Sequence, residues 1–440
     1  MSVEVRLTCI SVPFQRDCGS IISERSVCLG TRKYMKDILW ISCYAPYDSV
    51  SHAGGKIHNY WLKQFHKEQD FRIHLISFCN LDEVNRLDLD AYEIRNDIYV
   101  IGENVFKATK EKIQNLFALP ILLSRYAGFI SAHRILHVKK KIEELKQKDY
   151  KPDVIILQWT QIVLLEPLVR KAFPECKIVS IEEDVTFLKT EREFLRAQGI
   201  VKRFLRGMQH RIMKKQELGA LKASDLIVLN NYKDQGLLVK SGIDFSKAIC
   251  VTPFYNNMKE VKREIVGKDI LFFGAMNRPE NVEAAVWFIN NVFGDLLKSD
   301  PGFRFIVLGA YPPKTLQCLS NEQIIVTGFV EDPQAYFGSC FCLVSPLQMG
   351  AGIKIKVLES FSAGVPVLTN AIGIEGIPAE DGIEYFHCET SKQYLDKILF
   401  LRDHPEISDK IGANARLLIK EKFDFPEKSK EFIDRIKNLG

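Results

Sequence analysis

The stretch that decides the fold runs from Ser345 to Ile377 and reads SPLQMGAGIKIKVLESFSAGVPVLTNAIGIEGI. A predicted strand ends at Ser345, a glycine-rich loop follows, and a helix is predicted over 353–363. Gly364 takes the position after a helix C-terminus where a left-handed residue is favoured, and Pro366 lies just inside the next strand. A strand, a loop, a helix and a second strand in this order are typical of a parallel sheet covered by helices.

The same alternation continues along the rest of the chain in two halves. Short β-branched or aromatic segments are separated by helical ones, which predicts an α/β fold with two Rossmann-like domains facing across a cleft. An apolar stripe at three- and four-residue spacing predicts a helix over 281–298. The predicted strands are 37–43, 71–78, 97–101, 153–157, 177–181, 225–229 and 248–251 in the first half, and 269–273, 303–308, 323–327, 341–344 and 365–369 in the second.

A polar, lysine-rich stretch without periodicity separates the two halves. We therefore expect a first domain over 37–255, a linker over 256–268 and a second domain over 269–425. A C-terminal helix over 426–440 is expected to pack back on the first domain. Residues 1–36 fit neither half and are expected to form an N-terminal extension of unassigned role.

Composition indicates a globular chain of 440 residues, with 46% apolar and 26% charged residues. No run approaches the roughly 18–20 consecutive apolar residues that a membrane-spanning helix needs. The N-terminus lacks the layout of a secretory signal, and the 11 cysteines show no metal-binding spacing, so we expect a cytoplasmic protein with no metal site. A net charge of +5 is too small for this length to indicate nucleic acid binding.

The glycine-rich loop and the helix after it have the chemistry of a diphosphate site. Gly350 and Gly352 let the backbone approach a ligand closely, and the helix N-terminus aims N–H groups at the same place. Lys356 and Glu359 are three residues apart and share one helix face. A lysine can neutralise a diphosphate leaving group, and a carboxylate can bind the hydroxyls of a ribose. The alternative is an ordinary exposed ion pair, which stabilises a helix very little.

The pattern of Gly350, Gly352, Lys356, Glu359, Gly364 and Pro366 resembles the donor-binding segment of the family 4 glycosyltransferases, which have the GT-B fold. The resemblance covers about 150 residues of the second half. Further segments follow in family order: Phe273–Gly274, Pro279 with Asn281, Val307–Gly309, Thr327–Val330 and Gly373–Gly376.

The resemblance implies roles for individual residues of the second half. Glu359 would hold the ribose, and Lys356, with Arg278 or Lys354, would hold the diphosphate. Backbone at Phe329 and Val330 would hold the base. The loop amides of Gly350, Ala351, Gly352 and Ile353 would contact the sugar, and the substrate site would also include Gly274, Asn281 and Gly309. The resemblance implies no cofactor and no metal, because cations and a helix N-terminus stabilise the leaving group.

Two departures place the chain in a subset of that family. Many members carry a glutamate where this chain has Ala351, and an arginine and a lysine where it has Ala275 and Glu280. The donor-sugar contact of such members is therefore expected to differ here, whereas the nucleotide site is retained.

The first half carries two candidate acceptor-side features. Gly54 and Gly55 follow the first strand and resemble the glycine loop of the family, with a plain tight turn as the alternative. Of the nine histidines, His52 and His58 beside them are the two placed where chemistry is plausible. His58 is assigned to the substrate site.

Glu183 and Asp184 follow the predicted strand 177–181 and point into the cleft of an α/β domain. Either could position an acceptor hydroxyl, take its proton or shield a developing oxocarbenium ion, and a helix N-cap is the alternative for one of them. The catalytic candidates are thus Glu183, Asp184 and Lys356. Glu217 matches the family as a scaffold residue.

Two stretches of the first half are basic and amphipathic, namely 196–215 and 116–141. One interpretation is an ordinary surface helix with a solvated basic face. The other is peripheral contact with anionic headgroups on the inner face of the plasma membrane.

The resemblance implies a retaining glycosyltransferase of the hexosyltransferase type that uses a nucleoside diphosphate sugar. Its acceptor is expected to be a saccharide or a lipid-linked one, in cell-surface polysaccharide or glycolipid assembly. Two alternatives remain open: a nucleotide-sugar 2-epimerase on the same fold, and a non-catalytic nucleotide-binding partner of an active transferase.

Overall fold

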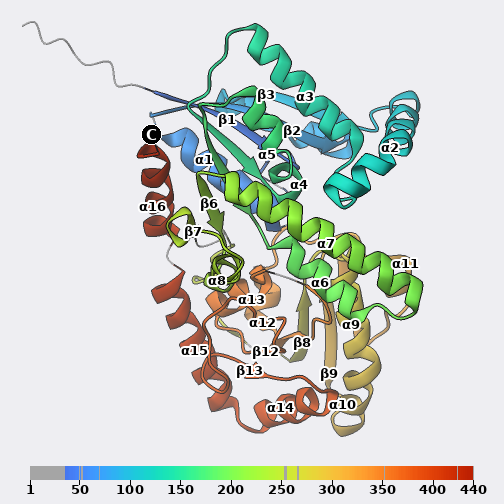
Figure 1. Ribbon diagram of the computed structural model, residues 1–440. Coiled ribbons are helices and arrows are strands. Elements are labelled where there is room, and N and C mark those ends of the chain that lie inside the picture. Colours follow the sequence, from blue (N-terminus) through green and yellow to red (C-terminus); the bar gives the residue numbers. More distant parts are fainter. Residues whose placement is uncertain are drawn as a thin grey trace, which may run out of the picture. The chain divides into compact units, whose positions relative to one another are not determined.

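The computed structural model describes residues 35–439, except 49, 51–52, 69, 252–254, 265–266, 351 and 424. Residues 35–440 form one compact unit, shown in Figure 1. The roles predicted for His52 and Ala351, and nearly all of the predicted extension 1–36, lie outside the described residues.

The first sheet has seven parallel strands in the order β3-β2-β1-β4-β5-β6-β7. Its central strands are apolar runs buried on both faces; Ile38 to Ile41 of β1 are fully buried. All seven strands predicted for this half are present. They are β1 Lys36–Ser42, β2 Phe71–Asn80, β3 Arg95–Ile101, β4 Val154–Gln158, β5 Lys177–Glu182, β6 Leu226–Leu229 and β7 Ala248–Cys250.

The second sheet has six parallel strands in the order β10-β9-β8-β11-β12-β13. The five predicted strands of this half are present, and the sequence analysis missed β13, because two residues are too few to show a period. The strands are β8 Lys268–Phe273, β9 Phe303–Leu308, β10 Ile324–Gly328, β11 Cys342–Ser345, β12 Val367–Thr369 and β13 Phe386–His387. The predicted α/β class with two Rossmann-like sheets is confirmed.

Helices cover each sheet, as Figure 1 shows. Those of the first half are α1 Ala53–Lys67, α2 Val105–Tyr126, α3 Ala132–Gln147, α4 Thr160–Val163, α5 Glu166–Ala172, α6 Thr186–Arg196, α7 Ile200–Ala223 and α8 Tyr232–Lys240, with short 3-10 turns η1 Leu81–Arg86, η2 Leu89–Tyr92 and η3 Phe245–Lys247. Those of the second half are α9 Pro279–Phe288, α10 Gly294–Ser299, α11 Lys314–Gln317, α12 Gln334–Ser339, α13 Ile355–Ala363, α14 Ser391–Asp403, α15 Pro405–Lys422 and α16 Phe425–Lys437. Within the described ranges, none of these helices is both long and apolar enough to cross a bilayer.

The helix predicted over 281–298 is divided by a π-helical turn, η4 Ile289–Phe293. Val292 and Phe293 are neighbours in sequence, yet both are buried in the core of the second sheet. The turn has the wider i→i+5 spacing in place of the i→i+4 spacing of the flanking helices α9 and α10. The prediction of one regular helix was therefore wrong at its centre.

Helix α13 begins at Ile355, two residues later than predicted, and ends as predicted. Gly364 has φ +70 and follows the helix in the left-handed region. A Cβ atom at Gly364 would lie 2.5 Å from Nε of Arg416, so glycine is needed there for space as well as for conformation.

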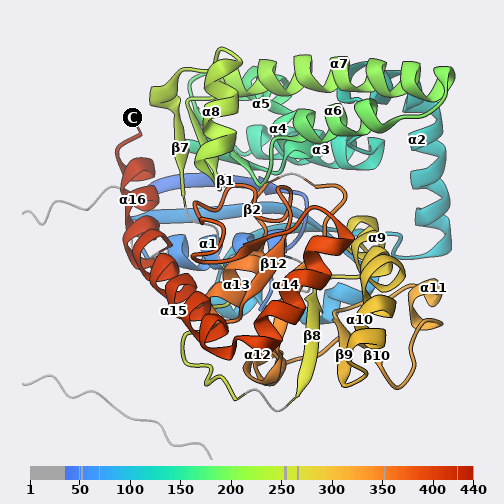
Figure 2. The ribbon, with the colours of Figure 1, turned by 90° about the horizontal axis from the view of Figure 1, so that it is seen from below.

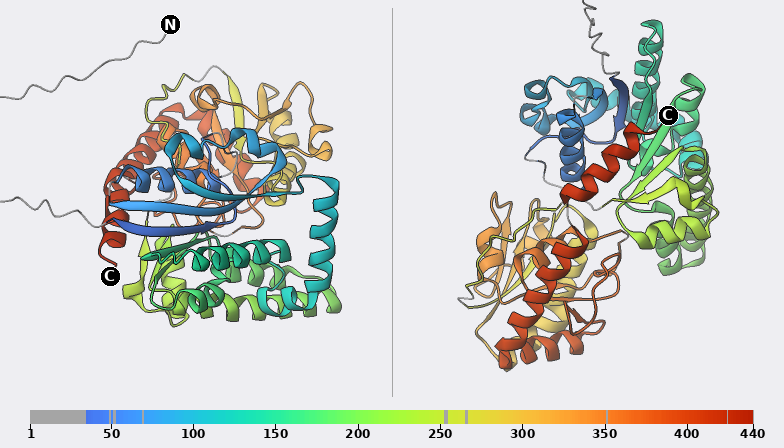
Figure 3. Two further views of the ribbon diagram at one scale, coloured as in Figure 1. Left: turned by 90° about the horizontal axis from the view of Figure 1, so that it is seen from above. Right: turned by 90° about the vertical axis from the view of Figure 1, so that its left-hand side faces the viewer.

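Helix α16 packs against α1 in the first half, beside which Figure 3 shows it. The ring of Phe432 lies edge-on to Trp61 and Phe65, with centroids 5.1 and 5.2 Å away. Lys437 also forms ion pairs with Glu68 and Asp70 at 2.6 and 2.9 Å. The chain end thus crosses back from the second sheet to the first.

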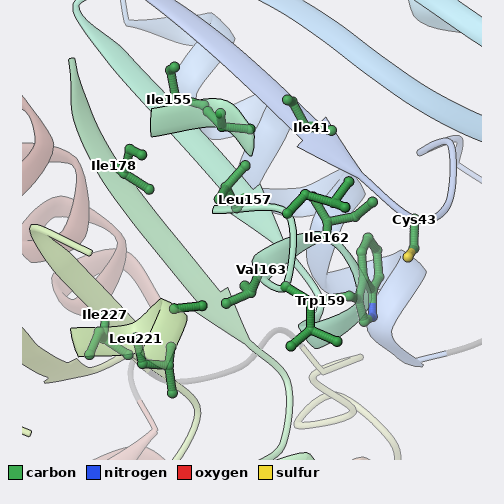
Figure 4. Close-up of a cluster of buried hydrophobic side chains, with 14 of the residues drawn as sticks. Ile41, Cys43, Ile155, Leu157, Trp159, Ile162, Val163, Ile178, Leu221 and Ile227 are labelled. Atoms are coloured by element: carbon green, nitrogen blue, oxygen red, sulfur yellow. The ribbon is translucent and has the colours of Figure 1, made fainter. Parts of the chain in front are cut away.

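Each sheet has a topological switch point, between β1 and β4 in the first and between β8 and β11 in the second. Ligands of doubly wound sheets bind at the carboxyl ends of strands near such points. Trp159 directly follows β4 and has φ +72, a strained conformation for a bulky residue. Its ring packs among core side chains that include Cys43 and Ile162, as Figure 4 shows.

Gly309→Ala is expected to lower the melting temperature by several degrees. A Cβ atom at Gly309 would lie 1.8 Å from the carbonyl oxygen of Gly274, so the ends of β8 and β9 would have to separate, which costs about 1–3 kcal/mol. Gly294→Ala is the matched control, because a Cβ there meets nothing within 4 Å. Calorimetry of both variants is the measurement, and equal melting temperatures would show that the strand ends tolerate the displacement.

Candidate functional site

A cavity of about 740 Å³ opens at the carboxyl ends of strands from both sheets. The first half contributes Gly54 after β1, Trp159 after β4, Glu183 and Asp184 after β5, and Asn230 after β6. The second half contributes the start of α9 and the residues just before α13. The wall from the second half is Asn277, Arg278, Pro279, Glu280, Tyr311, Ile353 and Ile355. The two switch points therefore share one cavity.

Glu183 is held in the cavity wall by two amide side chains. Its Oε1 accepts a hydrogen bond from Nε2 of Gln158 at 3.0 Å, and its Oε2 accepts one from Nδ2 of Asn230 at 3.0 Å. Desolvation raises the pKa of Glu183 to about 7, and the two amide hydrogen bonds oppose that rise. A carboxyl with this pKa can exchange a proton at neutral pH.

Asp184 lies beside Glu183 and touches the glycine-rich loop of the second half. A Cβ atom at Gly352 would lie 2.9 Å from Cβ of Asp184 and 3.2 Å from the carbonyl oxygen of Glu183. Gly352 has φ +71, so both its conformation and its contact with this corner require glycine. Burial raises the pKa of Asp184, and Lys189 and Arg278 oppose this.

Two further carboxyls lie beneath this corner, fully buried, and the sequence analysis gave neither a site role. Glu217 accepts the backbone N–H groups of Thr186 and Phe187 at 2.8 and 2.7 Å and so caps the start of α6. This is the scaffold position that its sequence suggested. Glu182 has Oε2 2.5 Å from Oγ1 of Thr160, and burial followed by repulsion from Glu217 raises its pKa well above the ordinary value.

On the second half, the predicted diphosphate residues meet at the ends of β8 and β9. Nζ of Lys356 donates to Oδ1 of Asn281 at 2.8 Å and lies 4.4 Å from the ring centre of Phe272. A Cβ at Gly274 would approach Nζ of Lys356 to 3.0 Å, which explains the glycine there. Desolvation, followed by the nearby Lys354, lowers the pKa of Lys356 to about 7.

Helices α9 and α13 both begin beside this lysine. Asn281, in the first turn of α9, is buried and donates to the carbonyl oxygen of Ala275 at 2.8 Å, so it ties the start of α9 to Lys356. Arg278 precedes α9 and lines the cavity with its half-exposed side chain. Two helix N-termini and two cations at one place favour a multiply charged anion.

Glu359, predicted to hold a ribose, is 2% exposed and is not among the described residues that line the cavity. Its Oε1 accepts the backbone N–H of Asn256 at 3.2 Å. Burial raises the pKa of Glu359, and Lys56 opposes this. The ribose role remains a prediction, and in this structure the carboxylate serves the connection between the halves.

His58 lies beneath the cavity. It is fully buried, its Nδ1 lies 3.1 Å from the carbonyl oxygen of Tyr44, and its ring meets Trp40 and Trp159. The predicted substrate contact of His58 therefore finds no support, because core side chains surround the ring. Gly54 does line the cavity, and a Cβ there would lie 3.1 Å from Nε1 of Trp159. Gly55 is next to it in α1.

The remaining predicted contacts are spread around the second half. Ile353 lines the cavity, and Nζ of Lys354 donates to the carbonyl oxygen of Gly352 at 2.5 Å. Phe329 is 64% exposed, and Val330 packs on the core of the second half. Neither is among the described cavity residues, so their contact with a base remains a prediction.

Sequence reasoning missed Gln158 and Asn230, which orient Glu183. Both follow apolar strands at the carboxyl edge of the first sheet, a position that could have drawn attention to them. Within the part of the chain that the structure describes, no three His, Cys, Asp or Glu side chains are grouped to hold a metal ion.

Residues 267–404 match the model of the family described as Glycosyl transferases group 1. One curated relative is an uncharacterized 44.6 kDa protein in the cps region of Klebsiella pneumoniae, 24% identical over 182 residues, which are 39% of this chain and 47% of that protein. The chain spans about half the length of the curated relatives that it matches.

Solved structures resemble nearly the whole chain. The sucrose-phosphate synthase of Thermosynechococcus elongatus has a TM-score of 0.67 at 12% identity, covering 92% of this chain and 99% of its own. Anabaena HepE in complex with UDP and glucose has a TM-score of 0.62 at 12% identity, covering 92% and 100%. Residues 267–404 thus match a group 1 glycosyltransferase domain, and the chain as a whole has the two-sheet fold of these solved structures.

Proposed function

We propose that the chain transfers a sugar from a nucleoside diphosphate sugar to an acceptor hydroxyl. The observation that carries this is the shared cavity, whose wall includes Arg278 and the starts of α9 and α13 on the second half and the Glu183–Asp184 corner on the first. Lys356 is not among the described lining residues and acts on the site beside Arg278. A diphosphate leaving group and an acceptor hydroxyl need these two environments within one site.

In the proposed reaction, the bond between the anomeric carbon and the diphosphate oxygen breaks, and a bond to the acceptor oxygen forms. Lys356, Arg278 and the N-termini of α9 and α13 stabilise the negative charge of the leaving diphosphate. Glu183 takes the proton of the acceptor hydroxyl, and Asp184 offers a carboxylate to the positive charge that develops on the sugar.

We propose UDP as the first donor nucleotide to test, because Anabaena HepE has been solved with UDP and glucose. Retention at the anomeric carbon follows from the family 4 resemblance. The cps region that holds the Klebsiella relative supports a saccharide or lipid-linked acceptor in surface polysaccharide assembly. The cations at the leaving group support transfer without a metal, so EDTA should leave the rate unchanged.

Thermal unfolding with UDP, GDP, ADP, CMP and dTDP tests the donor site. A nucleotide at about 100 times its Kd adds about 2.7 kcal/mol of stability, which raises the melting temperature by a few degrees. A shift with one nucleotide, followed by transfer from its sugar conjugates, is the expected result. A shift without turnover of any donor would favour the non-catalytic partner, and no shift at all would overturn the proposal.

UDP binding is expected to weaken as the pH rises above about 7. The pKa of Lys356 is about 7 without ligand, and a bound diphosphate raises it by opposing charge. Binding above pH 7 therefore takes up a proton, and affinity falls by up to about tenfold per pH unit until the pKa of the bound form is reached. Calorimetric titration from pH 6.5 to 8.5 measures the slope, and Lys356→Met should reduce it, leaving the part that Lys354, with its pKa lowered to about 8 by burial, contributes. A flat profile in the wild type would contradict this assignment.

We also propose that the first half binds an anionic lipid surface through α2 and the start of α7. These helices pack against each other, as Figure 2 shows. The predicted apolar face of 200–208 is exposed. The exposed apolar residues are Val105, Phe106, Ile113, Leu116, Phe117, Leu119, Ile121 and Leu123 of α2 and Ile200, Val201, Phe204, Leu205 and Met208 of α7.

Basic side chains accompany the apolar ones along α7, and this combination is typical of helices that lie at anionic membrane surfaces. Replacing Lys202, Arg203, Arg211 and Lys214 by Gln should release the protein from vesicles that contain phosphatidylserine at low salt. Replacing Lys139, Lys140, Lys146 and Lys148 of α3 and its C-terminal end is the matched control. Wild-type protein that never sediments with these vesicles would overturn the proposal.

A further inference from the structure

A cluster of ion pairs holds the glycine-rich loop of the second half against the first half. Arg192 of α6 binds Glu375 with both ends of its guanidinium, Nη2 to Oε1 at 2.5 Å and Nη1 to Oε2 at 3.1 Å. The same Nη1 donates to the carbonyl oxygen of Gly350. One side chain of the first half therefore binds two loops of the second half, one at Gly350 and one at Glu375.

Glu375 is the centre of this cluster. Its side chain is 9% exposed and has two further cations near it, Lys233 of α8 at 2.8 Å and Lys354 at 3.8 Å. Burial alone would raise the pKa of Glu375, but the contacts with Arg192 and Lys233 outweigh burial and hold it below its ordinary value. Glu375 is therefore a carboxylate that attracts cations from both halves.

The contacts around the cluster show that the two halves fit closely here. Next to Glu375, a Cβ at Gly376 would lie 3.0 Å from Cβ of Asn231 in the first half. On the other loop, Gly352 lies against Asp184. Arg192 and Glu375 are not among the described residues that line the cavity. The cluster therefore contacts the loop from outside the cavity.

We infer that Arg192 is a positioning residue of the donor site, which sets the shape of the loop at 350–354 when the two halves meet. A carbonyl oxygen of Gly350 turned toward a diphosphate would repel it, and the hydrogen bond from Arg192 holds that oxygen beside the Glu375 cluster instead. Arg192 binds both carboxylate oxygens of Glu375 and the carbonyl oxygen of Gly350. Only the planar guanidinium group, with its several N–H donors, can make these three contacts at once. The inference rests on the proposed donor function.

Kinetics and UDP titration of Arg192→Met and Arg192→Lys test this role. Arg192→Met should raise the KM for the donor and the Kd for UDP by about tenfold or more, within the range of coupling between distinct sites. Arg192→Lys should lie between it and the wild type, since one ammonium can hold Glu375 but not both loops. Arg170→Met is the matched control, because Arg170 pairs with Glu166 and Asp225 inside the first half at similar exposure.

A double-mutant cycle of Arg192→Met and Glu375→Gln separates a pairwise contact from general damage. Because both changes remove the same ion pair, the double variant should lose less UDP affinity than the product of the two single losses. Hydrogen exchange of the backbone amides of residues 352–354, measured without ligand, should be faster in Arg192→Met than in the wild type. This measurement does not depend on which nucleotide the protein binds. If the wild type binds UDP and Arg192→Met binds it equally well with unchanged exchange, the inference is wrong. If the wild type binds no nucleotide, the proposed function fails, and unchanged exchange would still overturn the positioning role.

Discussion

Glu183→Gln is expected to lower kcat by about 100- to 10,000-fold, the usual contribution of a positioned general base. Glutamine keeps the shape of the side chain and can still accept one of the two amide hydrogen bonds, while its NH2 group faces the other donor, and it cannot take a proton. UDP binding should change little, because Glu183 lies on the first half and the anion site on the second. Steady-state kinetics with the donor found in the nucleotide screen, together with the UDP-induced shift in melting temperature, measure both quantities.

Glu280→Gln is the matched control for this prediction. Glu280 also lines the cavity, and its closest cation is Arg278 at 4.0 Å. Its replacement should change kcat by no more than about fivefold, since a partly exposed ion pair contributes about 1 kcal/mol at most. In the wild type at saturating donor, kcat should rise as the pH increases through about 7, where Glu183 ionises. The kcat/KM for the donor should instead pass through a maximum near pH 7, because Lys356 of the free enzyme loses its charge above it. A Glu183→Gln variant with normal turnover would remove Glu183 from the mechanism.

Lys356→Met is expected to lower kcat/KM for the donor by about 100- to 1,000-fold, comparable with the removal of one oxyanion-stabilising donor. The methionine retains much of the apolar contact with Phe272 but has no charge for the leaving diphosphate. It also leaves Oδ1 of Asn281 without the 2.8 Å hydrogen bond that Lys356 donates. Donor kinetics and UDP titration would show losses in both KM and kcat.

Lys298→Met serves as the control, because Lys298 is 80% exposed in α10 and pairs with Asp295 on the same helix. Its loss should leave donor kinetics within about twofold of the wild type. The melting temperature of Lys356→Met in the absence of nucleotide checks that the second half remains folded. Donor kinetics near the wild-type values in a folded Lys356→Met protein would place the diphosphate elsewhere.

For Glu359, the role implied by the motif differs from the surroundings that the structure shows. The resemblance assigns it to a ribose, whereas the structure buries its carboxylate against the backbone of Asn256. Spacing along a helix predicts which residues share a face, but it does not predict what covers that face. The linker at 255–264 covers it here, and no local pattern predicts the path of a linker.

The exposed apolar residues of α7 also show that spacing predicts a helix face but not what covers it. Periodicity correctly predicted a helix with an apolar face around Phe204 and Leu205, yet that face contacts no core. Whether an apolar stripe is buried depends on the neighbours that the fold supplies. Met213 and Leu221, farther along the same helix, are buried because the first sheet lies beneath them.

The sequence by itself determined the two parallel sheets, the glycine after α13, the position of Lys356 at the start of that helix and the position of Glu183 after β5. Period, helix ends and motif spacing are local properties, so they can be read along the chain. Only the tertiary structure decided that Asn281 holds Lys356, that Gln158 and Asn230 hold Glu183, and that Arg192 binds Glu375. These partners are far apart in sequence, 183 residues in the last case. They meet because the order of the strands and the packing of the two halves bring them together. Neither the strand order nor this packing can be recognised in a short stretch of sequence.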